Sequence, residues 1–141
     1  MNGINSTSAK YRQYHAIAKH WASDVDFFKI ETVFLHHLLD DYFIRLSGPE
    51  YLEALKSVGA KLLELEKDKY NADIHLIEHL KNLEGQTEDL VFERGEFLAD
   101  KHEHMEHVMT HLTTTYRILK KELFLLIQQV IKAQLEISLI H

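Results

Sequence analysis

The sequence has no cysteine, one proline and only five glycines in 141 residues. Without cysteine there are no disulfide bridges, thiolate metal sites or cysteine nucleophiles. So little proline and glycine excludes a β-sandwich or β-barrel, which needs frequent tight turns. The chain also lacks a basic surplus, since 16 Lys and Arg stand against 22 Asp and Glu, a formal net charge of −6. We therefore expect no nucleic-acid partner, because such a partner requires a basic stripe.

Signals for membranes and for known catalytic chemistry are lacking as well. The first residues carry no basic region followed by an apolar one, as a secretory signal would. The most apolar stretch, residues 122–141, contains Glu122, Lys132 and Glu136, which are costly in a bilayer. Neither HExxH, GxSxG, a P-loop nor GxGxxG occurs. We therefore expect a soluble cytoplasmic protein without membrane contact, and not an enzyme.

Helix-forming composition dominates, and two breakers divide it. With 45% apolar and 27% charged residues, the length suits a single domain over residues 1–141. Gly48-Pro49 reads as the end of one helix and the start of another, and Gly85 as a second such end. These signals predict a helix to about Ser47, a second from Pro49 to about Glu84, and a third from Thr87 to near the C-terminus. The first helix is expected to begin near Ser8 or at Ser23, with residues 1–7 as a flexible tail.

Apolar residues recur at alternating steps of three and four, as in coiled-coil-like packing. The first helix carries this pattern from Trp21 to Leu46, and the third carries it from Val91 to Ile140, with His102 on the apolar seam. The pattern is weaker in the second helix, where Leu76, Leu80 and Leu83 carry it near the end of the helix. The expected fold is an all-α, up-down bundle of three long helices.

The expected register leaves the end of the third helix uncovered. Antiparallel neighbours of similar length place residue 37 level with about residue 111, so residues 122–141 extend about 20 residues, or about 30 Å, further. Their apolar side chains are expected to form a homodimer interface through Leu123, Leu126, Val130 and Ile137. In the alternative, the third helix breaks near Thr114 and folds back into a four-helix bundle. The heptad runs through Thr113–Thr115 without a phase shift, which favours an unbroken helix.

Eleven histidines supply the one chemical feature of the sequence. His75/His79 and His107/His111 have the i, i+4 spacing that directs two imidazoles to one side of a helix. Candidate ligands for iron, manganese or zinc are imidazoles and carboxylates expected at similar levels in the bundle: His36, His102, His104, His107, His111, Glu31 and Glu66.

The competing interpretation involves no metal. In the heptad frame His104, His107 and His111 face solvent. His102 is then a buried histidine hydrogen-bonded to Glu31 or Glu66.

Two resemblances accompany these patterns. Residues 101–107 (KHEHMEH) resemble a histidine-bearing helix of hemerythrin-like proteins, although His75-x-x-x-His79 replaces that family's His-x-x-x-Glu. A second set of residues resembles a family of small uncharacterised bacterial helical proteins, which implies a helical bundle and no activity: Trp21, Asp24, Phe27, Glu31, Leu35, Leu38 and residues 77–82.

The sequence therefore favours a non-enzymatic helical bundle that acts by self-association or partner binding, without a cofactor. The alternative function is a metal-binding bundle that uses histidine and carboxylate ligands, similar to hemerythrin-like or di-iron proteins.

Overall fold

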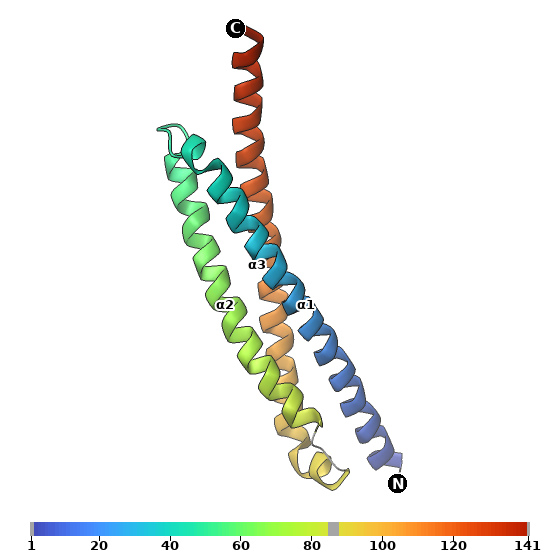
Figure 1. Cartoon of the computed structure of the whole chain (residues 1–141). Coiled ribbons are helices and arrows are strands. Elements are labelled where there is room, and N and C mark those ends of the chain that lie inside the picture. The colour runs from blue at the N-terminus through green and yellow to red at the C-terminus, as the bar shows by residue number, and fades with distance from the viewer. Residues whose placement is uncertain (1, 85–87, 141) are drawn as a thin grey trace. The chain divides into compact units, whose positions relative to one another are not determined.

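The described part of the chain is almost entirely helical. A computed structural model describes the backbone of residues 2–84 and 88–140 and the side chains of residues 9–84 and 94–139. Of the described residues 96% are helical. They form three helices and no strand: α1 (Asn2–Leu46), α2 (Leu52–Glu84) and α3 (Glu88–Ile140) (Figure 1). The expected all-α fold is confirmed.

The helix ends lie close to the expected breakers. α1 ends at Leu46, where the amide of Ser47 donates to the carbonyl of Phe43 at 2.9 Å. The amide of Leu52 donates to the carbonyl of Gly48 at 3.0 Å, so α2 begins at Leu52, three residues after the expected start at Pro49. The expected cap at Gly85 lies outside the described residues.

Two expectations about helix length change. α1 begins at Asn2, so the helix includes residues 2–7, where we expected a flexible tail. No proline interrupts this stretch, and its Ser and Thr residues are tolerated within a helix. α3 continues from Glu88 to Ile140 through Thr114, so the fold-back into a fourth helix is not adopted.

Backbone contacts divide the chain into two compact units. Unit 1 comprises residues 1–28 and 68–112, and unit 2 comprises residues 29–67 and 113–141, so all three helices contribute to each. In unit 2 one side-chain contact joins each pair of helices. Glu31 of α1 contacts Lys120 of α3, His36 of α1 contacts Glu66 of α2, and Lys61 of α2 contacts Glu122 of α3. Within each unit the helices run up, down and up.

The buried side chains follow the expected seam. On α3 they recur at steps of three and four from Leu98 through His102 to Val130. On α2 the seam near the end of the helix passes through Ala72, Leu76, His79 and Leu83 instead of Leu80. The apolar pattern thus identified the inward face of α3 and missed one position of α2.

The expected register of α3 is wrong by about three turns. It would place Glu31 level with about residue 105, but Glu31 contacts Tyr116, about eleven residues further along. Seam residues recur at steps of four and three, so a slide of about eleven residues (four, three and four) also brings seam residues together, and apolar spacing alone does not determine the register.

The shift covers most of the expected dimer interface. Leu123, Leu126 and Val130 are buried within the chain itself, with exposed fractions of 0%, 7% and 3%, whereas Ile137 is 57% exposed. The uncovered segment therefore begins after Val130 and is about half as long as expected. Within residues 2–84 and 88–140, none of the helices has both the length and the apolar character of a membrane-spanning helix.

Two helical glycines should respond oppositely to alanine. A Cβ at Gly59 of α2 meets nothing within 4 Å, so Gly59→Ala should raise the free energy of unfolding by about 0.5–1 kcal/mol. A Cβ at Gly95 of α3 would lie 2.8 Å from the Tyr11 hydroxyl and displace it from its hydrogen bond to the Gly95 carbonyl. Gly95→Ala should therefore give no stabilisation in urea denaturation. An equal gain from both substitutions would contradict the close approach of Tyr11.

Candidate functional site

A pair of buried histidines forms the most unusual feature of unit 1. His79 on α2 is 3% exposed and His102 on α3 is 6% exposed, because each occupies a seam position of its helix. Nε2 of His79 lies 3.0 Å from Nδ1 of His102, a hydrogen bond between the two rings. Two imidazoles thus replace an apolar layer of the core.

Aromatic side chains of α1 hold His102 in place. Its ring stacks on Tyr14 at 4.0 Å between centroids and on Trp21 at 4.7 Å. Tyr14 in turn meets Tyr11 edge to face at 5.3 Å, and the Tyr11 hydroxyl donates to the carbonyl of Gly95 at 2.6 Å. Because α1 supplies three rings to this cluster, the orientation of the imidazole of His102 is fixed by packing.

Both histidines are uncharged at neutral pH. Burial, and to a smaller extent the neighbouring His102 and Lys101, together lower the pKa of His79 from 6.5 to about 4. Burial also lowers the pKa of His102. In a neutral pair one ring donates and the other accepts.

One nitrogen of this pair has no hydrogen-bond partner. Among the buried side-chain atoms described, Nδ1 of His79 is unsatisfied. A cavity of about 20 Å³ adjoins His79 between α2 and α3, and His75, Glu78, Lys101 and His104 also line it. A buried polar atom without a partner is rare, and its presence beside a cavity marks a candidate ligand site.

The exposed histidines line a neighbouring groove. His107 and His111 on α3 face solvent, as the heptad predicted, and a groove of about 350 Å³ lies between them and His75 and Asp68 of α2. His107 lies 4.0 Å from Glu103 on its own helix. His104 belongs to the smaller cavity instead.

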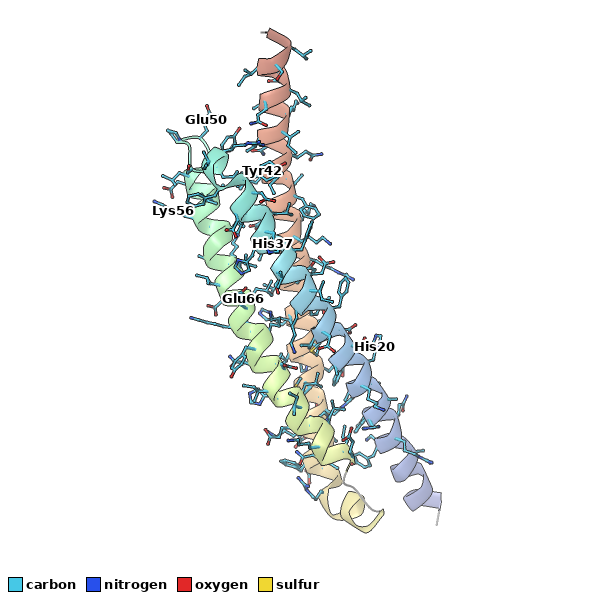
Figure 2. The ribbon with its side chains drawn as sticks, in the orientation of Figure 1. His20, His37, Tyr42, Glu50, Lys56 and Glu66 are labelled. Carbon is cyan, nitrogen blue, oxygen red and sulfur yellow. The ribbon has the colours of Figure 1, made fainter. Side chains whose placement is uncertain are left out.

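In unit 2 the expected carboxylate ligands already have partners. Tyr116 donates to Glu31, and Nζ of Lys120 lies 3.2 Å from the same carboxylate. These two contacts, the tyrosine first, lower the pKa of Glu31, whereas burial and Glu31 raise the pKa of Tyr116. Glu66, which projects from α2 in Figure 2, contacts the ring of His36.

The expected metal ligands are therefore distributed over different contacts. His36 and Glu66 meet, but Glu31 pairs with Tyr116 and Lys120. His102 bonds to His79, where we expected Glu31 or Glu66; the displaced register of α3 explains the difference. Across the residues described, no three His, Asp or Glu side chains are arranged to hold a metal ion.

Sequence reasoning missed the role of His79. The signal was present, since Ala72, Leu76, His79 and Leu83 keep the steps of four and three, but the apolar Leu80 was chosen for the seam instead. Nothing in the sequence pattern predicted that Tyr14 and Trp21 would stack on His102.

Comparisons with known proteins give no assignment for this arrangement. No known family, curated protein or solved structure matches the chain. Chemically, the histidine pair offers one buried imidazole nitrogen without a hydrogen-bond partner, and the exposed imidazoles of His75 and His104 line the same cavity.

Acid should weaken the fold through His79. The unfolded chain takes up a proton at this ring near pH 6.5, and the folded chain only near its lowered pKa of about 4. The stabilisation that His79 contributes is therefore complete above pH 6.5 and decreases as the pH falls toward 4, by up to about 1.4 kcal/mol per pH unit.

Urea denaturation between pH 7.5 and 4.5 measures this dependence. His79→Leu should reduce its slope, and the matched control is His20→Leu on α1, a histidine whose side chain is 77% exposed (Figure 2). Equal slopes for the wild type and His79→Leu would contradict a buried neutral imidazole.

Proposed function

We propose that the chain is a non-enzymatic helical bundle that self-associates through the end of α3. The observation that carries this proposal is the abrupt end of burial in unit 2. Val130 is 3% exposed, and large apolar side chains that follow it are open to solvent at 40–86%: Ile131, Leu135, Ile137 and Leu139. The end of α3 continues past the turn between α1 and α2 (Figure 1).

This surface is large enough for a moderate association. Full burial of one such side chain contributes about 1.5–3 kcal/mol, and two copies supply eight of them, each already partly covered. Association costs about 4–15 kcal/mol in lost freedom and ordering. The balance predicts a dimer that forms at micromolar concentrations.

A second copy of the chain suits this surface better than a charged partner. The seam spacing continues beyond Val130 through Ala133, which is half-buried, and Ile137, which is 57% exposed. Residues 131–139 carry one Lys and one Glu, so two copies approach without net repulsion. We propose an antiparallel pair about a two-fold axis, in which each α3 end covers the other. The net charge of −6 favours a protein partner over nucleic acid.

Substitution of the exposed α3 residues tests the proposal. Leu135→Glu with Ile137→Glu places charges in the expected interface and should give monomers at concentrations where the wild type sediments as a dimer. Folding should be retained, because both side chains are more than half exposed. Sedimentation velocity from about 1 to 100 μM, together with circular dichroism, provides both readouts.

A matched control uses apolar residues of α1 in the same unit. Ile30 and Phe34 are 70% and 49% exposed, and Ile30→Glu with Phe34→Glu should leave the dimer intact. A wild type that stays monomeric at 100 μM would overturn self-association. A dimer lost only in the α1 variant would place the interface elsewhere.

A further inference from the structure

The small cavity of unit 1 is lined in part by His79, the residue that carries the unsatisfied nitrogen. Nδ1 of His79 is buried without a partner, while Nε2 of the same ring is 3.0 Å from Nδ1 of His102. If Nε2 carries the proton, it donates to His102 and leaves a lone pair on Nδ1 facing outward from the pair. The opposite tautomer would bury an N–H group with no acceptor, which costs more than an unused lone pair.

Contacts behind His79 resemble those that orient metal-binding histidines. A ligating imidazole generally donates its other N–H to a neighbouring acceptor, which fixes the tautomer and the ring. Here the acceptor is His102, whose own ring is held by stacking on Tyr14 and Trp21. The nitrogen is thus held in position by contacts that reach from α2 through α3 to α1.

Two further imidazoles border the same cavity. His75 precedes His79 by one helical turn on α2, and His104 lines the cavity from α3; both side chains are exposed. Glu78 adds a negative charge that offsets Lys101, which also lines the cavity. Because no three described side chains already surround a common point, His75 and His104 must turn toward Nδ1 of His79 to complete a site.

We propose that this cavity binds one divalent transition-metal ion of the zinc class, with Nδ1 of His79 as the fixed ligand and His75 and His104 as ligands that close on it. A volume of about 20 Å³ admits a single ion. Imidazole ligands favour zinc, copper and nickel over calcium and magnesium, which prefer oxygen. The site lies in unit 1, so it is independent of the self-association assigned to the end of α3.

Titration of the full chain with Zn²⁺ tests the site. Isothermal calorimetry of untagged protein should show one ion per chain, and binding should weaken at least tenfold in His75→Ala with His104→Ala. Both residues are exposed, so this variant keeps its fold. The matched control is His107→Ala with His111→Ala, an exposed i, i+4 pair outside the cavity, which should bind as the wild type does.

A second measurement follows His79 without replacing it. In nitrogen-detected NMR of the histidine rings, stoichiometric Zn²⁺ should shift Nδ1 of His79 and leave its bond to His102 in place. The proposal is overturned if Zn²⁺ does not bind at millimolar concentration, or if Nδ1 of His79 does not shift. Loss of binding in the control variant also overturns it, because the ion would then belong to the wider groove lined by His107 and His111.

Discussion

The need to satisfy buried polar groups determines how far α3 slides along its neighbours. Apolar side chains at steps of three and four pack nearly as well after a shift of one or more heptads. A buried imidazole or a partly buried carboxylate does not, because it loses its partner at considerable cost. His79 with His102 in unit 1, and Glu31 with Tyr116 and Lys120 in unit 2, each require one register within their unit.

Residues close together in the sequence were sufficient to predict the helix boundaries and the buried face of α3. Gly48-Pro49 predicted the end of α1 within a residue, since a proline removes a donor and a glycine favours a turn. The phase of the heptad predicted both the buried face of α3 and its continuity through Thr114. Each of these features depends on neighbouring residues alone, so sequence spacing contains the necessary information.

The register of α3 and the partners of the buried polar residues depend on contacts between residues far apart in the sequence. The expected position of α3 along its neighbours was derived from matching helix lengths, and it was wrong by about three turns. Leu123, Leu126 and Val130, which we expected at the surface, are therefore buried in the core. The same error assigned carboxylate partners to His102, where the structure has a second histidine. As a result, the exposed apolar segment is shorter than expected, and the candidate ligand site centres on His79, outside the original set of ligands.

Zero-length cross-linking within the chain tests the register most directly. Carbodiimide joins Lys to carboxylates in contact, and Nζ of Lys61 lies 2.9 Å from Glu122, while Nζ of Lys120 lies 3.2 Å from Glu31. Mass spectrometry of the cross-linked monomer should identify Lys61–Glu122 and Lys120–Glu31 amides. A Lys101–Glu31 amide without either of them would show that α3 adopts the register expected from helix lengths, in which Glu31 lies level with about residue 105, and would contradict polar pairing as the determinant of the fold.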